Sequence, residues 1–431
     1  MATDPPVSDN QENRRALWSW ALYDWANSAF FTIILTFIFA RYFSQSVVQD
    51  EVTGTEAWGN IVGLSGLVVA ILAPVLGAIA DQSGRRKPWL VGFTLLCVVA
   101  TGMLWYVEPG SGSIWQAAFW VSLGILGAEC AFIFYNAMLP DLASPARVGR
   151  WSGWAWGLGY VGGVTCLVVA LFGFIEGDTS WLGLDREELE HVRATFVLVA
   201  VWHLLFSLPA FFLIPDRPSR GLPLATAVTA GLRQLRDSIR EVRKYRTIVR
   251  FLIARMLYTD GLATIFTFGG VYAAGTFGMS QTQVLQFAIA LNVTSGLGAL
   301  GFAWVDDAIG GRNTVLLSLT GLTLCALSIL LVTDTLWFWV VGMTLGIFVG
   351  PLQSASRSYL ARVAPPHLQT QMFGLFAFSG KATAFLGPLL VGWVTAFSGS
   401  QRWGMSTILV FLAVGFALML TVPPASKTAH Q

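Results

Sequence analysis

The stretch Gly77-Ala-Ile-Ala-Asp81-Gln-Ser-Gly84-Arg85-Arg86-Lys87 separates two long apolar runs with a carboxylate, a glycine and three consecutive cations. A weaker version, Asp307-Ala-Ile-Gly310-Gly-Arg312, occupies the corresponding place in the second half of the chain. Leu22-Tyr23-Asp24 and Leu257-Tyr258-Thr259-Asp260 repeat in the same order, each within the first apolar run of its half. We therefore predict two similar halves that follow each other in parallel order.

The chain around these stretches is strongly apolar. Apolar residues make up 55% of the 431 residues and charged residues only 12%, about half of what a soluble domain carries. A helix that spans a membrane needs about 20 largely apolar residues, and twelve such runs are present. The twelve expected helices lie near 18–43, 57–80, 88–107, 115–139, 150–175, 194–215, 247–275, 282–305, 314–332, 336–362, 370–396 and 402–422. Residues 1–16 do not resemble a signal peptide, so we expect the first helix to be retained.

The predicted fold is an all-α membrane protein of two pseudo-symmetric six-helix bundles. Its expected parts are an N-terminal tail (1–17), a first bundle (18–215), a basic linker (216–246), a second bundle (247–422) and a C-terminal tail (423–431). In the linker, cations recur at helical spacing with Leu232 and Leu235 between them. This pattern is typical of an amphipathic helix on an anionic inner leaflet, so no nucleic-acid partner is needed to explain it.

The distribution of positive charge predicts the orientation. If both termini lie inside, the inner loops and tails hold 19 Lys and Arg residues and the outer loops hold four. Cytoplasmic loops are enriched in Lys and Arg. We therefore expect a multi-pass protein of the bacterial cytoplasmic (inner) membrane with both termini in the cytoplasm.

The 77–87 stretch resembles the signature loop of the major facilitator superfamily, with Gln82 where a basic residue is usual. Tyr23-Asp24-Trp25-Ala26-Asn27-Ser28-Ala29-Phe30 resembles the hallmark of the "unknown major facilitator" family, whose fungal relatives are autophagy-related vacuolar amino-acid effluxers. Asn136–Pro140, Tyr258–Gly261 and Ser356–Ser358 also resemble motifs of that family. The resemblance implies the major facilitator fold, a transporter, and amino acids or similar solutes as cargo.

Ionisable residues inside the apolar runs are the candidate functional groups, because a charge at the bilayer centre costs about 2.5–3.5 kcal/mol on insertion scales. In the fold that the resemblance implies, helices 1, 4, 7 and 10 line a central cavity, and each of them carries such a residue. The predicted substrate-binding or coupling residues are Asp24, Asn27, Glu129, Asn136, Asp260, Arg357 and Lys381.

Several roles stay open for these residues. Glu129 lies in an apolar stretch, where burial disfavours a lone carboxylate, so it is the candidate proton-coupling site. The alternative is a static pair with Lys381 or Arg357. Asp24 and Asp260 could cap helices or pair with an arginine instead of binding solute. Arg255, near the start of its helix, is interpreted as an interfacial cation.

The two repeated loops are predicted to act mechanically. Their carboxylates and cations can form ion pairs and helix-end contacts on the inner face in an outward-open state, and these break when the halves rock. The residues of this predicted gate are Gly77, Asp81, Gly84, Arg85, Arg86, Asp307 and Arg312. In the run expected near 150–175, glycines form a small-residue face, which favours close helix packing.

The expected function is secondary active transport of a small polar solute by alternating access, with protons as the coupling ion and a monomer as the working unit. Export of lipophilic compounds is the alternative, and a non-transporting receptor or a membrane enzyme is a remote one. Ser379-Gly380-Lys381-Ala382 lacks the spacing of a phosphate-binding loop. We expect no enzyme activity, cofactor or metal site.

Overall fold

The computed structural model describes residues 12–425 apart from 177–182, 220 and 241, and all regular secondary structure in that part is helical. Eleven helical segments are long and apolar enough to span a membrane. Two shorter helices in series form a twelfth pass, so the fold class predicted from the sequence is confirmed. The predicted tails lie largely outside the described residues, although the first helix already begins at Arg14.

The first bundle contains six passes. These are α1 (Arg14–Ala29), continued by a π-helix (Phe30–Phe37), α2 (Phe39–Tyr42) and a second π-helix (Phe43–Val47); α3 (Glu51–Ser83); α4 (Lys87–Met103), followed by a 3-10 turn (Leu104–Tyr106); α5 (Ile114–Leu142), after a 3-10 turn (Ser111–Ser113); α6 (Val148–Ala170), ending in a π-helix (Leu171–Ile175); and α7 (Glu190–Leu213).

The linker and the second bundle follow. The linker forms α8 (Leu224–Arg240) and a 3-10 turn (Val242–Tyr245), and the passes are α9 (Arg246–Phe277), α10 (Gln281–Ile309), α11 (Gly311–Leu331), α12 (Thr335–Val363), α13 (Gln369–Ser379, after a 3-10 turn Pro366–Leu368) with α14 (Leu386–Ser398), and α15 (Gln401–Leu420).

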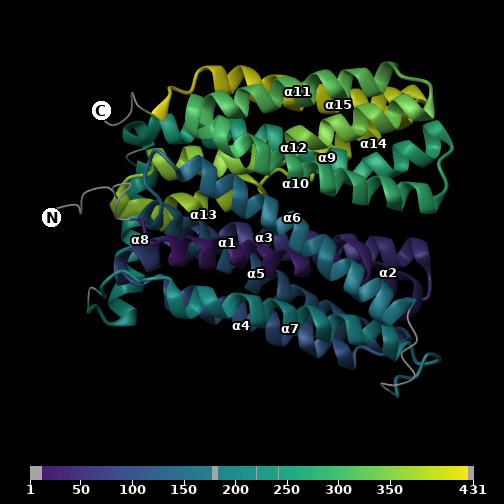
Figure 1. The fold of residues 1–431 in the computed structure, drawn as a ribbon, viewed down its shortest axis with the longest axis horizontal. Helices are drawn as coiled ribbons and strands as arrows, with labels where there is room; N and C mark the ends of the chain where they lie inside the picture. Colours follow the sequence, from purple (N-terminus) through teal and green to yellow (C-terminus); the bar gives the residue numbers. More distant parts are fainter. Residues whose placement is uncertain (1–11, 177–182, 220, 241, 426–431) are drawn as a thin grey trace.

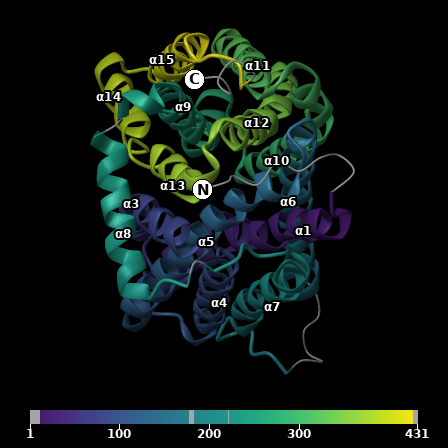
Figure 2. The same ribbon diagram turned by 90° about the vertical axis from the view of Figure 1, so that its left-hand side faces the viewer.

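The two bundles lie side by side, and α1 begins at the same end of the molecule where α15 finishes (Figure 1). We call this end the termini end. At this end α8 runs along the rim of the molecule from the first bundle to the second (Figure 2). It packs tightly on α3, since a Cβ at Gly231 would lie 2.8 Å from the backbone nitrogen of Ile79. One face of the predicted membrane-surface helix is therefore a protein contact.

The eleventh pass is broken, and the prediction of one continuous helix over 370–396 is wrong. Between α13 and α14 the backbone hydrogen bonds shorten to an i to i+3 pattern, as in Lys381 N–H to Phe378 C=O at 3.0 Å. The guanidinium of Arg255 competes for the end of α13 by donating to the carbonyl oxygen of Phe376 at 2.6 Å. Irregular backbone at membrane depth is tolerated where it lines a cavity, and Lys381 lies in this break.

The predicted small-residue face of the fifth pass is confirmed. On one side of α6 a Cβ at Gly162 would lie 2.6 Å from the carbonyl oxygen of Trp25 in α1. On the other side a Cβ at Gly153 would lie 2.7 Å from the carbonyl oxygen of Ala299 in α10. Helix α6 therefore packs against its own bundle and against the other bundle through backbone contacts that admit no side chain.

Replacing Gly162 by alanine should destabilise the protein, because overpacking a tight contact costs about 1–3 kcal/mol. The matched control is Gly92→Ala in α4, where an added Cβ meets nothing within 4 Å. Thermal unfolding in detergent measures both. We expect a lower Tm for Gly162→Ala only; equal Tm values for the two variants would contradict the packing account.

Candidate functional site

A cavity of about 540 Å³ lies between the two bundles. Residues of α1, α5, α9 and α12 line it, the four helices that the resemblance implied, and α6, α10 and α13 also contribute. Of the predicted site residues, Asp24, Asn27, Glu129, Asn136, Arg357 and Lys381 line this cavity. Asp260 does not; its carboxylate faces Gly387 and Thr383 at the broken pass.

The lining of the cavity contains a buried ion pair that joins the two bundles. Arg357 of α12 donates from Nη1 to Asp24 Oδ2 of α1 at 3.0 Å. Tyr135 of α5 donates its hydroxyl to the same carboxylate oxygen at 2.8 Å. Asp24 is 4% and Arg357 1% exposed. Since a buried ion is stable only when it is paired and hydrogen-bonded, Asp24 and Arg357 depend on each other.

Arg357 makes further contacts with the first bundle. Its Nη2 donates to the carbonyl oxygen of Ser152 at 2.7 Å and its Nε to the hydroxyl of the same residue at 2.8 Å. Its Nη1 also reaches Asn136 Oδ1 at 3.2 Å. The guanidinium carbon lies 4.9 Å from the ring centre of Trp20. This one side chain of the second bundle is thus anchored on α1, α5 and α6 of the first.

A second ion pair joins the two bundles across the cavity. Lys381, in the break of the eleventh pass, places Nζ 2.8 Å from Glu129 Oε1 of α5. Glu129 is therefore not isolated in this conformation, and the paired alternative describes its geometry. Both side chains are only partly buried, at 18% exposure for Glu129 and 26% for Lys381. Because they stay in contact with the cavity, this pair can be opened by a ligand.

The interpretation of Arg255 as an interfacial cation is wrong, because its side chain is buried and faces the cavity. It is 7% exposed, lines the cavity, and stacks its guanidinium over the ring of Phe376 at 3.4 Å from the centroid. Its Nη1 donates to the Phe376 carbonyl oxygen and, at 2.8 Å, to Ser379 Oγ. Depth along the helix suggested the interface, but the rotation of α9 turns the side chain inward.

The charges that line the cavity do not balance. Among the described residues around it, three cations (Arg255, Arg357 and Lys381) face two carboxylates (Asp24 and Glu129). Two neutral groups in the lining, Asn27 Oδ1 and Trp156 Nε1, have no hydrogen-bond partner among the described residues. Both atoms are buried, so the excess positive charge is the property of the lining that a solute meets in this conformation.

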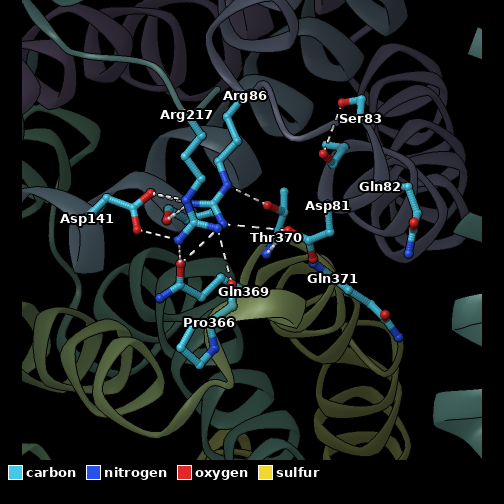
Figure 3. A network of polar contacts seen from close by, with 12 residues as sticks. Asp81, Gln82, Ser83, Arg86, Asp141, Arg217, Pro366, Gln369, Thr370 and Gln371 are labelled. Atoms are coloured by element: carbon cyan, nitrogen blue, oxygen red, sulfur yellow. Dashed lines mark hydrogen bonds and ion pairs between the residues drawn. The ribbon is translucent and has the colours of Figure 1, made fainter. Parts of the chain in front are cut away.

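Asp81 closes the termini end by capping a helix of the other bundle (Figure 3). Its two carboxylate oxygens accept from the backbone N–H groups of Thr370 at 3.1 Å and Gln371 at 2.8 Å. These are the second and third residues of α13, whose own N-cap, Leu368, makes no side-chain cap. Gly77, on the same helix as Asp81, allows the approach, since a Cβ there would lie 2.4 Å from the Thr370 carbonyl oxygen.

Asp307 makes the corresponding contact in the opposite direction. Its Oδ1 accepts from the backbone N–H of Arg150 at 3.0 Å, the third residue of α6. The Arg150 side chain adds an ion pair to Asp307 at 3.3 Å. The N-cap of α6, Arg147, provides no side-chain cap. The repeated loops thus give each bundle one carboxylate that caps a helix of the other, which satisfies backbone donors and the helix dipole.

Arg86 and Arg217 extend the closure around Asp81 (Figure 3). Arg86 Nη1 donates to Asp141 Oδ2 at 2.8 Å and its Nε to Thr370 Oγ1 at 2.8 Å. Arg217, from the linker, forms an ion pair with the same Asp141 carboxylate and donates to Gln369 Oε1 at 2.6 Å. Burial lowers the pKa of the Arg86 guanidinium, and the carboxylates of Asp141 and Asp81 oppose this effect. Opposite charges therefore surround the buried cation.

The remaining residues of the predicted gate have local contacts. Gly84 ends α3 with φ of 84°, a backbone conformation that favours glycine. Arg85 is exposed and pairs with Asp216 at 3.3 Å. Arg312 donates to the carbonyl oxygens of Leu420 and Val422 within its own bundle. Of the predicted cations, Arg86 is thus the one whose described contacts join the bundles.

Sequence reasoning missed Asp141, Arg217 and the cavity position of Arg255. Asp141 directly follows the Asn136–Pro140 motif, which was a usable signal. Arg217 lies in the linker among many cations, and nothing in the pattern distinguishes it. Within the described part of the chain, no group of three or more His, Cys, Asp or Glu side chains could hold a metal ion.

The fold, two six-helix bundles around a central cavity, is shared by solved structures of the major facilitator superfamily. The proton:xylose symporter XylE superimposes with a TM-score of 0.73 over 97% of both chains at 14% identity. FucP in the outward conformation gives 0.73 over 95% of this chain and 99% of its own at 13% identity. The human organic anion transporter MFSD10 gives 0.70 over 94% and 99% at 17% identity.

Sequence comparison gives the narrower assignment. Residues 60–149 and 146–431 match the family described as "Vacuole effluxer Atg22 like". The chain belongs to this family. It is 24% identical to the uncharacterized MFS-type transporter YxiO of Bacillus subtilis over 95% of both chains. It is 25% identical to autophagy-related protein 22 of Yarrowia lipolytica over 65% of this chain and 52% of that protein. The family is described as an effluxer family and YxiO as an MFS-type transporter, so the chain is a multi-pass membrane transporter of the major facilitator superfamily and not an enzyme.

Breaking the Asp24–Arg357 pair should destabilise the protein, because a buried charge that loses its partner costs about 3–5 kcal/mol. We expect Asp24→Asn and Arg357→Met each to lower the Tm, and the double variant to lose clearly less than the sum of the two. Arg85→Met is the control, since its exposed pair contributes about 0–1 kcal/mol. Additive losses from the two single changes would show that the residues are not coupled.

Proposed function

We propose that this transporter moves a small carboxylate-bearing solute, of which amino acids are the leading class, by alternating access with proton coupling. The observation that carries the proposal is the excess of positive charge in a cavity shared by both bundles. Working as a monomer is compatible with this site, because one chain supplies all of the lining residues described.

The proposed conformation is outward-facing. Lys and Arg residues are concentrated in the loops and tails of the termini end, and the positive-inside rule then places that end in the cytoplasm, in a bacterium at the inner membrane. The two helix caps, made by Asp81 and Asp307, close this end. Rocking of the bundles would break both caps together and expose the cavity to the cytoplasm.

Arg255 and Lys381 are the proposed carboxylate-binding groups. Arg357 is occupied by Asp24, and Lys381 by a pair that the cavity can reach. The hydrogen bonds of Arg255 go to neutral groups, a carbonyl oxygen and a hydroxyl. A planar guanidinium binds a carboxylate in bidentate fashion. The side-chain oxygen of Asn27, a lining residue, has no partner among the described residues and is the proposed acceptor for the ammonium group of an amino acid.

Glu129 is the proposed proton site. A substrate carboxylate that binds Lys381 competes with Glu129, whose Oε1 lies 2.8 Å from the same ammonium group in this conformation. A carboxylate that loses a neighbouring cation binds a proton more readily. Solute binding and proton uptake are then coupled through one lysine, without a direct contact between solute and proton.

Glu129→Gln should abolish the pH dependence of transport while leaving the fold intact. Proteoliposome uptake or counterflow of amino acids, with and without a pH jump, measures this effect. Glu56→Gln is the matched control, because Glu56 is exposed and lies outside the cavity lining. A pH response in Glu129→Gln equal to that of the unmodified protein would contradict the proton-site assignment.

Export of lipophilic compounds is the second candidate, favoured by aromatic side chains in the lining such as Phe31, Phe132 and Phe266. A thermal-shift panel of amino acids, other small carboxylates and amphipathic cations separates the two. We expect a carboxylate-bearing compound to raise the Tm of the unmodified protein but not the Tm of Arg255→Met. Stabilisation by amphipathic cations alone would overturn the carboxylate proposal.

A further inference from the structure

A second pocket, of about 230 Å³, lies at the termini end between the linker helix and the second bundle. Its walls are apolar: Leu235 of α8, Leu252 and Met256 of α9, and Leu375 and Phe378 of α13 contribute to them. An apolar hollow of this kind favours apolar ligands, because burying apolar surface is favourable. The central cavity, in contrast, is charged, so the two hollows suit different ligands.

The position of this pocket matches the hydrocarbon edge of one leaflet. Its α9 wall consists of the first three turns of a membrane-spanning helix. Ile253 and Phe378, which belong to the lining, are 43% and 41% exposed. In a spanning helix, exposed apolar side chains face lipid. The pocket is therefore accessible from the bilayer, next to the termini end.

Polar groups near the pocket favour a lipid with a negative headgroup. Gln371 lines the pocket, is 0% exposed, and its Nε2 has no hydrogen-bond partner among the described residues. An ester or phosphate oxygen is a suitable acceptor for this donor. Arg246, beside the lining residue Tyr245, is exposed at the start of α9. Arg236 is exposed on α8, where its Nε lies 3.5 Å from Oδ1 of the neighbouring Asp237. Basic residues at the headgroup level attract anionic lipids.

We propose that this pocket binds an anionic glycerophospholipid of the leaflet at the termini end. One acyl chain lies between α8 and the second bundle, a lipid oxygen accepts from Gln371 Nε2, and the headgroup contacts the exposed arginines. The inference does not depend on the solute or on proton coupling, because no described residue that lines this pocket also lines the central cavity.

Gln371 connects this site to the closure of the termini end. Its backbone N–H donates to Asp81, and its Oε1 accepts from Gln234 of α8 at 2.7 Å. Gln234 in turn accepts from Gln82 of α3. The linker helix thus joins α3 to α13 through three amides, and a lipid that packs α8 onto the second bundle stabilises the closed arrangement.

The test is native mass spectrometry of the full-length protein in detergent with added palmitoyl-oleoyl phosphatidylglycerol or phosphatidylcholine. Leu252→Trp fills the pocket, and Leu324→Trp is the control at an exposed site on α11. We expect phosphatidylglycerol to be retained by the unmodified protein and by the control. Leu252→Trp should retain at least about fivefold less phosphatidylglycerol, the change in the binding constant that about 1 kcal/mol produces.

A second pair of variants keeps the proposal falsifiable if a tryptophan disturbs folding. Gln371→Met and Gln234→Met both remove the Gln234–Gln371 hydrogen bond, but only Gln371→Met removes the amide that lines the pocket. Loss of phosphatidylglycerol in Gln371→Met alone supports the site. The proposal would be overturned if both variants retained phosphatidylglycerol equally, or if the unmodified protein retained phosphatidylcholine as well as phosphatidylglycerol. Displacement of the lipid by an amphipathic transport substrate would also overturn it.

Discussion

The two helix caps made across the bundles are the interaction on which this conformation depends. A helix N-terminus leaves backbone N–H groups without partners, and α6 and α13 carry no side-chain cap of their own. Asp307 and Asp81 provide those caps from the opposite bundle. Each cap joins two rigid helices, so neither bundle can tilt away at the termini end without exposing uncapped donors.

The other polar contacts between the bundles follow from this closure. With the termini end closed, Arg357 can reach Asp24 and Ser152 on the first bundle, and Lys381 can reach Glu129. The first of these contacts is buried and multiply bonded, whereas the second is accessible from the cavity. This difference in burial distinguishes a structural anchor from the pair that we propose a solute opens.

The sequence was sufficient for the passes and for the location of the gate, because both depend on local signals. Long apolar runs identify spanning helices, and the repeated loops placed Asp81 and Asp307 at equivalent helix ends. Features set by helix rotation or by breaks in the helix were not predictable. Arg255 looks interfacial by its depth, and Lys381 looks like one residue of a continuous helix. Their positions in the cavity depend on packing around Gly380 and Phe376, which no spacing rule reveals.

The distance across the termini end tests the central claim most directly. The four native cysteines are buried, so spin labels can be placed at Ala146→Cys and His367→Cys, two exposed positions on opposite bundles. Replacing a capping residue by alanine costs about 0.5–2 kcal/mol, so Asp81→Ala with Asp307→Ala should shift the distance distribution from short to long separations. If the spin-labelled protein gave the same distance distribution with and without these two substitutions, the claim that the two caps hold this end closed would be contradicted.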